Sequence, residues 1–256
     1  MSKPKKKAAA KKPVRRPAKA KAKAKPKAAK TLHQSHFPGE SAAYRKARDQ
    51  LLKAEMVMRR NVEALSMQRR KLPLGGGIPE DYVFEEQADV VGIHKVRLSE
   101  LFAPGKDTLV VYSFMYGPAM ERPCPSCTSI LDSLDGNAVS IGQRVNLVVV
   151  AKSSVPRIMV FAKERGWRHL RLLSSAGNTY NRDYFGESPE GKQWPMLNVF
   201  RKQDGVIRHF WASELLLVPA EKGQNGRHVD FMWPLWNVFD TTPEGRGTDW
   251  YPKLSY

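Results

Sequence analysis

Cysteine is scarce in this chain, with only two among 256 residues. Small secreted folds stapled by disulfides are dense in cysteine, so this class is excluded. Long apolar runs are also missing: the longest, residues 108–116 and 145–151, are much shorter than the roughly 18 residues of a membrane span. The N-terminus has no apolar signal core and lacks the Ser-rich amphipathic pattern of a transit peptide. We therefore expect a cytoplasmic protein without membrane contact.

Acidic residues are absent from residues 1–30, which hold fourteen Lys and Arg side chains. The net charge is +18, so the other 226 positions carry only +4 of it. Residues 1–35 are rich in Lys, Ala and Pro and cannot bury enough apolar surface to fold, which predicts a disordered basic tail. Such a tail either binds nucleic acid non-specifically, with association to the nucleoid, or serves only to solubilise the chain. The candidate phosphate contacts are Lys5, Lys6, Lys7, Lys11, Lys12, Arg15 and Arg16.

Residues 36–78 predict a helical arm followed by a glycine-rich joint. Between residues 41 and 70, Leu51, Met58 and Leu65 recur every seven positions, and Ser41 is a suitable N-cap. The narrow apolar stripe fits either a face docked on the chain's own domain or a coiled-coil seam. The helix is expected to end before Pro73, and residues 75–77 are all glycine.

Residues 79–215 alternate between strand and helix patterns. The run at 108–116 is β-branched and aromatic, which is typical of a strand buried on both faces. We expect a helix over 128–134, stopped by Asp135-Gly136-Asn137, and another over 156–165. The expected strands are 82–85, 96–98, 108–116, 145–151, 169–173, 196–201 and 206–211. Alternation followed by a hairpin predicts an α/β domain with a mixed sheet flanked by helices. Residues 216–256 form an aromatic extension expected to pack on this core.

The two cysteines form a C-x-x-C pair, Cys124 and Cys127, that opens a helix after a buried strand. The helix N-terminus favours a thiolate at Cys124, and Cys127 lies one turn on, within reach of a mixed disulfide. Pro125, as first helical residue, has no N–H to leave unpaired and presets the backbone. Arg122 adds positive charge that we expect to lower the pKa of Cys124, although Glu121 opposes it. This pattern predicts thiol–disulfide exchange without cofactor or metal.

Half of a zinc site is the structural alternative for a C-x-x-C pair. A closed site needs four ligands, and the chain has no second cysteine pair. Its six histidines are scattered and none shows the spacing of a zinc finger. A site shared between two subunits remains open, as does the oligomeric state.

Further segments carry a resemblance over about four fifths of the chain. They are Tyr44-Arg45-Lys46-Ala47-Arg48-Asp49, Tyr82-Val83-Phe84, Leu98-Ser99-Glu100-Leu101-Phe102, Val110-Val111-Tyr112-Ser113-Phe114-Met115, Cys124-Pro125-Ser126-Cys127-Thr128, Gly166-Trp167 and Phe239-Asp240-Thr241-Thr242-Pro243-Glu244-Gly245-Arg246. In their order and spacing they resemble a bacterial thioredoxin-like family, described as predicted dithiol-disulfide oxidoreductases of unassigned function. The resemblance implies a thioredoxin-like core with Cys124 and Cys127 as redox pair. It implies no particular substrate, so the partner is a protein or small-molecule thiol or disulfide.

Trp194 and Pro195 precede the strand expected at 196–201. An aromatic residue before proline raises the frequency of a cis peptide bond. In thioredoxin-like folds a cis-proline at this point faces the redox pair and the adjacent backbone pairs with substrate, so Pro195 and Trp194 are the candidate substrate-positioning residues. A plain proline at the entry of a strand is the alternative.

A peroxiredoxin signature, P-x-x-x-T-x-x-C, is absent at Cys124. Its proline and threonine positions hold Gly117 and Glu121. The activating hydroxyl is therefore missing, which argues against peroxide reduction by that mechanism. A redox-inactive binding module, with the tail on nucleic acid, is the other function class left open.

Overall fold

The computed structural model describes residue 1, residues 32–88 and residues 92–255. The basic residues proposed to contact phosphate, Lys5, Lys6, Lys7, Lys11, Lys12, Arg15 and Arg16, lie outside the described part. The chain divides into two compact units, residues 1–64 and residues 65–256, and each is described by itself. No helix in the described residues is long and apolar enough to cross a membrane.

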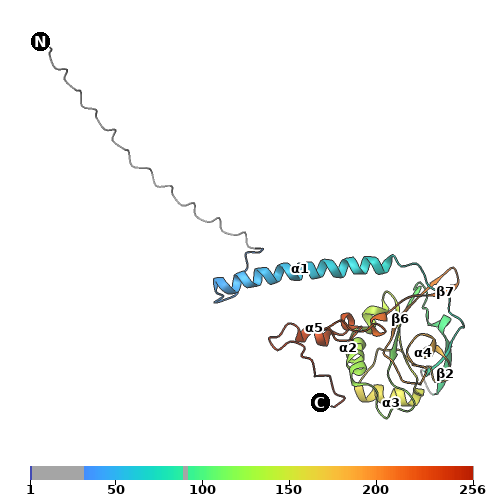
Figure 1. Cartoon of the computed structure of the whole chain (residues 1–256). Coiled ribbons are helices and arrows are strands. Elements are labelled where there is room, and N and C mark those ends of the chain that lie inside the picture. The colour runs from blue at the N-terminus through green and yellow to red at the C-terminus, as the bar shows by residue number, and fades with distance from the viewer. Residues whose placement is uncertain (2–31, 89–91, 256) are drawn as a thin grey trace. The chain divides into compact units, whose positions relative to one another are not determined.

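The helix expected in the arm is α1 (Ala42–Arg70), shown in blue to cyan in Figure 1. Ser41 caps it, because the Tyr44 N–H donates a hydrogen bond to Ser41 Oγ at 3.1 Å. The apolar side chains Leu51, Met58 and Val62 of the first unit are exposed. The last residues of α1 belong to the second unit, where the Arg69 guanidinium lies over the Trp211 ring at 4.9 Å.

The described residues of the second unit form one seven-stranded sheet in the order β2-β1-β5-β4-β3-β6-β7. The strands β3, β4 and β5 run parallel. Two antiparallel hairpins flank them: β6–β7 pairs with β3 through β6, and β1–β2 pairs with β5 through β1. Their bounds are β1 (Val83–Gln87), β2 (Ile93–Arg97), β3 (Thr108–Phe114), β4 (Asn146–Ala151), β5 (Leu172–Ser174), β6 (Leu197–Gln203) and β7 (Val206–Ala212). Asp204 and Gly205, both at positive φ, turn β6 into β7 as the expected hairpin requires.

The strand β3 lies inside the sheet and sends alternate side chains into two cores. Leu109 and Val111 enter one core, together with Phe84 of β1 and the leucines of the 3₁₀ helix η1 (Leu98–Leu101). Tyr112 and Phe114 enter the other core, where α2 (Pro125–Gly142) and α3 (Val155–Arg165) pack. The period of two along the strand therefore places Tyr112 on the face that carries the cysteine helix.

The helix α2 is longer than expected, and the predicted stop at residues 135–137 is wrong. Asp135 does not cap the helix, because its Oδ1 accepts hydrogen bonds from the N–H groups of Arg168, His169 and Leu170 at 2.8–3.0 Å. Nothing lies within 4 Å of a Cβ built at Gly136, and the helix passes through it. A tertiary partner more than thirty residues away thus overrides a local stop signal.

The C-terminal extension contributes large aromatic side chains to the same core as α2. It contains η3 (Asp230–Met232) and α5 (Pro234–Phe239), drawn in red in Figure 1. Trp233 and Trp236 are only 3% and 1% exposed. The Trp233 indole N–H donates to Ser129 Oγ of α2 at 3.1 Å, so the extension is tied to the cysteine helix.

From β3 onward the elements follow the order β3, α2, β4, α3, β5, the short α4 (Tyr180–Asp183) and the β6–β7 hairpin. This is a thioredoxin-like arrangement. The cysteine pair opens the helix between its first two parallel strands, as the C-x-x-C rule requires. The fold class expected from the sequence, a mixed α/β sheet flanked by helices, is confirmed.

Candidate active site

The cysteine pair lies where the loop after β3 enters α2. Cys124 is the N-cap residue, Pro125 the first helical residue, and Cys127 sits in the first turn. The Cys124 N–H donates to the Met115 carbonyl at 3.0 Å, which holds the loop against the end of β3. Both cysteines are free thiols; Cys127 is buried and Cys124 is partly exposed. The arrangement leaves one sulfur open to a substrate and one beneath it.

The two thiols have opposite pKa shifts. The Cys127 thiol, by hydrogen bonding to the Cys124 sulfur, lowers the pKa of Cys124 to about 6, and the N–H groups of Cys127 and Ser126 act in the same direction against burial. These N–H groups face the sulfur without a cap hydrogen bond of ordinary geometry. Burial, with Cys124 next to it, raises the pKa of Cys127 well above the usual value. At neutral pH Cys124 is therefore the thiolate and Cys127 its proton-bearing partner.

Tyr112, on β3, lies beneath the pair. Its side chain is fully buried, and its hydroxyl makes no hydrogen bond of ordinary geometry with any described group. The Cys127 thiol nevertheless faces it closely enough that each group affects the pKa of the other. Burial is the main cause of the raised pKa of Tyr112, so the phenol stays protonated.

Pro195 lies at the cysteines, but its peptide bond is trans. No cis peptide bond occurs in the described residues, so the bond between Trp194 and Pro195, whose isomer the sequence left open, is trans. The Met196 N–H donates to the Trp194 carbonyl at 3.2 Å, which closes a three-residue turn centred on Pro195. An inverse γ-turn of this kind accepts the φ of a trans proline at its centre.

A cavity of about 190 Å³ opens directly on the pair. Its floor comes from β3, α2 and Pro195, and its cover comes from the C-terminal extension. Its lining is largely apolar, and Trp194 is not part of it. The lining residues are Tyr112, Cys124, Ser126, Cys127, Ile130, Pro195, Leu216, Asn225, Gly226, Arg227, His228, Val229, Trp233 and Tyr251. The extension thus completes the wall that the thioredoxin-like core leaves open.

Two basic side chains of the extension line this cavity, but neither offers it a free positive charge. The Arg227 Nε donates to both carboxylate oxygens of Asp230, at 3.0 and 3.2 Å, and its guanidinium stacks on Trp236 at 4.2 Å. Burial lowers the pKa of His228 to about 4, so its imidazole is neutral at pH 7. A hydrogen bond of 2.8 Å joins His228 Nδ1 to Ser213 Oγ. The cavity therefore suits an uncharged guest.

A family model described as "Bacterial protein of unknown function (DUF899)" matches residues 34–256. The chain belongs to the DUF899 family. The family predicted from the sequence is therefore shown only as one of unknown function, and the dithiol–disulfide activity implied by the resemblance stays a prediction. No curated protein matches the DUF899 chain.

Several solved structures are similar to the DUF899 chain at low identity. Thioredoxin peroxidase I of Plasmodium yoelii is 21% identical, covering 65% of this chain and 90% of its own, with a TM-score of 0.41. The reduced 2-Cys peroxiredoxin of Plasmodium vivax is 16% identical, covering 64% and 94%, with a TM-score of 0.43. A peroxiredoxin-like protein of Aquifex aeolicus is 13% identical, covering 55% and 75%, with a TM-score of 0.39. At these values the similarity does not extend to activity.

Arg122 pairs with Glu164 in this DUF899 chain, and its expected role in tuning the Cys124 thiol stays a prediction. Its guanidinium pairs with both carboxylate oxygens of Glu164 on α3, one of them at 2.9 Å, and lies over the Phe161 ring at 5.1 Å. It is absent from the groups that lower the pKa of Cys124. The acidic partner lies 42 residues along the chain, where no local pattern reveals it.

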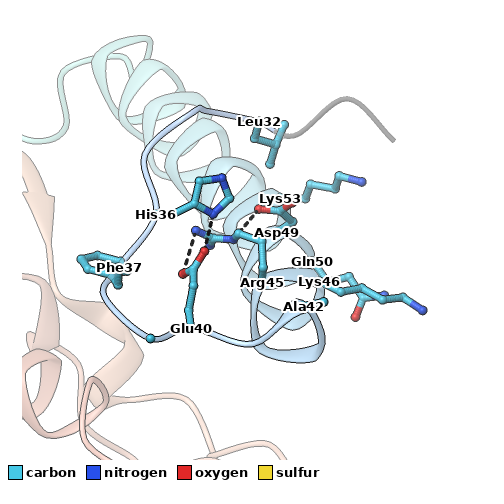
Figure 2. Close-up of a pocket in the computed structure, with 11 residues that line it drawn as sticks. Leu32, His36, Phe37, Glu40, Ala42, Arg45, Lys46, Asp49, Gln50 and Lys53 are labelled. Carbon is cyan, nitrogen blue, oxygen red and sulfur yellow. Dashed lines mark hydrogen bonds and ion pairs between the residues drawn. The ribbon is translucent and has the colours of Figure 1, made fainter. Parts of the chain in front are cut away.

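A larger hollow, of about 700 Å³, lies in the first unit, between the segment before α1 and the first turns of that helix. Figure 2 shows four of its polar side chains turned toward one another: Glu40 accepts from His36 and Arg45, and Arg45 also pairs with Asp49 at 3.3 Å. It contains no cysteine. Without a redox group, this hollow lacks the chemistry of the cysteine cavity.

The cover of the cavity is the part of the site that sequence reasoning missed. Gly226, His228 and Val229 lie in a turn-rich stretch without periodicity, so no pattern linked them to Cys124. Tyr112, on the strand expected at 108–116, both lies in the core and lines the cavity. The described residues contain no group of three or more His, Cys, Asp or Glu side chains arranged to hold a metal ion.

Proposed function

We propose that this DUF899 protein is a thiol–disulfide oxidoreductase in which Cys124 attacks and Cys127 resolves. One observation carries the proposal: within a single helical turn, the accessible thiol has a pKa of about 6 and the buried thiol has a raised one. Disulfide exchange needs this asymmetry, because the thiolate is the attacking form and the second thiol must wait for the mixed disulfide.

The proposed reaction balances as two exchanges. The Cys124 thiolate attacks one sulfur of a substrate disulfide, the substrate S–S bond breaks, and the first thiol leaves after taking a proton from water. Cys127 then attacks the Cys124 sulfur of the mixed disulfide, and its proton ends on the second departing thiol. The substrate gains two electrons, the pair becomes the Cys124–Cys127 disulfide, and a cellular thiol reductant restores it.

The cavity favours a small, uncharged disulfide over a polypeptide. Its volume of about 190 Å³ is below the several hundred Å³ of common ligand pockets. Residues of the extension, between Asn225 and Tyr251, line the cavity beside the pair and leave less room for a substrate chain. Pro195, on the cavity wall, positions the substrate beside Cys124, and Trp194 acts only through Pro195, since it does not line the cavity. No cofactor is required.

A redox titration followed by alkylation and mass spectrometry tests this function. Protein equilibrated over a series of thiol–disulfide ratios should pass from two alkylated cysteines to none, as an intramolecular Cys124–Cys127 disulfide link forms. Failure to form this link at any ratio would remove the proposal and favour a redox-inactive binding module. Zinc at about half an equivalent per chain in purified protein would instead favour a metal site shared by two subunits.

For the basic tail we propose non-specific binding to nucleic acid, independent of the cysteines. The support is charge alone: fourteen basic and no acidic residues in the first thirty. In the cell this would place the protein in the cytoplasm, at the nucleoid.

A further inference from the structure

The Tyr112 hydroxyl is a polar group without a partner, buried at the cysteines. The side chain is 0% exposed, and no described group forms a hydrogen bond of ordinary geometry with its oxygen. Buried hydroxyls normally have partners, because an unpaired one forfeits its hydration without compensation. A tyrosine kept here in place of a phenylalanine therefore needs a reason beyond packing.

The polar side chain that faces this hydroxyl is the Cys127 thiol. Cys127 and Cys124 are the side chains that shift the pKa of Tyr112, and Tyr112 and Cys124 are those that shift the pKa of Cys127. Ile130 and Trp233, also on the cavity wall, are apolar, and the polar lining residues of the extension are not among the groups that shift the pKa of Cys127. No carboxylate or imidazole is among the groups that act on Cys127. When Cys127 gives up its proton, the phenol is the nearby side chain able to donate to the sulfur.

We propose that Tyr112 is a catalytic residue of the resolving step, whose hydroxyl donates a hydrogen bond to the Cys127 sulfur as it becomes a thiolate. This rests on the proposed function. A neutral thiol is a weak acceptor, which fits the unpaired hydroxyl of the resting state. A thiolate is a charged acceptor, and hydrogen bonds to charged groups are about twice as strong as neutral ones. The Cys127 thiolate formed during the reaction is thus the acceptor that the Tyr112 hydroxyl lacks in the resting protein. Tyr112 keeps its own proton throughout.

The attack and the resolution can be timed separately with one equivalent of dithiodipyridine, a small neutral disulfide whose thiol product absorbs light. Attack by Cys124 releases the first thiol, and resolution by Cys127 releases the second. For Tyr112→Phe we expect an unchanged first phase and a second phase slower by roughly tenfold or more, with its pH midpoint displaced upward by about one unit.

Tyr180→Phe is the matched control. The Tyr180 hydroxyl is also buried and unpaired, but it lies in the opposite core, away from the cysteines. Both substitutions remove an unsatisfied hydroxyl, so neither should lower the urea midpoint of unfolding. A merely structural Tyr112 would thus behave like Tyr180.

The outcomes separate the two proposals. A slowed second phase in Tyr112→Phe alone supports the role of Tyr112. Equal second phases in Tyr112→Phe, Tyr180→Phe and wild type overturn it, as does a first phase slowed as much as the second. If wild-type protein releases only one thiol per chain, Cys127 does not resolve, and the proposed function itself fails.

Discussion

Trp233 donates its indole N–H to the Ser129 hydroxyl at 3.1 Å, and so joins the C-terminal extension to the helix that begins at the cysteines. Ser129 stands two residues after Cys127, on the first turns of α2. The extension is therefore positioned by the same helix whose N-terminus activates Cys124. The helix α2 thus carries Cys124 at its N-terminus and also holds the extension that lines the cavity.

Ser129→Ala should lower the free energy of unfolding by about 1–2 kcal/mol, because it leaves the buried indole N–H without its acceptor. Urea denaturation of the reduced protein measures this. Ser133→Ala is the control, since the Ser133 hydroxyl donates only to a backbone carbonyl within α2, at 3.2 Å. A Ser129→Ala protein as stable as the control would show that the indole bond contributes nothing to holding the extension.

Asp135→Ala should be more damaging, at roughly 2–4 kcal/mol, because three backbone N–H groups lose one shared acceptor at a carboxylate that is 9% exposed. The same urea measurement applies. Asn137→Ala is the comparison, since the exposed Asn137 side chain bonds only to the Ser133 carbonyl, at 3.3 Å. Equal effects at the two positions would contradict the structural role given to Asp135.

Three local sequence signals mark elements of the fold where they were expected. The β-branched run of β3, the Ser41 cap and the left-handed Gly166 after α3 (φ 75°) are local signals, and each has the expected element beside it. The stop predicted at Asp135 is wrong because the hydrogen-bond partners of its carboxylate lie outside α2, and the local sequence does not show that Arg122 pairs with Glu164 on another helix. Local patterns predict where the elements and the cysteine pair lie. They do not predict which distant groups compete for a charge.

The sequence does not predict the cavity for the same reason: the residues that cover it, between 216 and 251, lie far along the chain from the cysteines. Neither hydrophobic period nor motif connects His228 to Cys124, and only the packing of the extension on α2 brings them to one wall. The cysteine pair itself was predictable, because its chemistry depends on a strand, a helix start and two residues between the sulfurs.

The size of the cavity predicts a preference among substrates. Wild-type protein should reduce dithiodipyridine with a kcat/KM at least tenfold above that for the disulfides of insulin. Gly226→Leu, at a lining position where nothing lies within 4 Å of an added Cβ, should narrow the cavity and raise KM for the small disulfide. Gln224→Leu, exposed and outside the lining, is the control. Faster turnover of insulin than of the small disulfide would contradict the covered site.

The basic tail should act independently of the thiols. Deleting residues 2–30 should abolish retention on DNA at low salt and leave the rate of dithiodipyridine reduction unchanged. In the full chain, the logarithm of the binding constant should fall linearly with the logarithm of salt concentration. DNA retention that survives the deletion would assign the binding to another surface.

The most direct test of the central claim is the pH dependence of Cys124 alkylation in the reduced protein, followed by mass spectrometry. We expect a midpoint of about 6, because the Cys127 thiol and the helix N–H groups stabilise the thiolate. Since the folded pKa is below the unfolded value of about 8.5, this thiolate stabilises the reduced fold, fully above pH 8.5 and no longer once the pH falls through 6. Cys127 should stay unmodified over the same range. A Cys124 midpoint near 8.5, as in an ordinary exposed thiol, would show that Cys124 is not the thiolate at neutral pH.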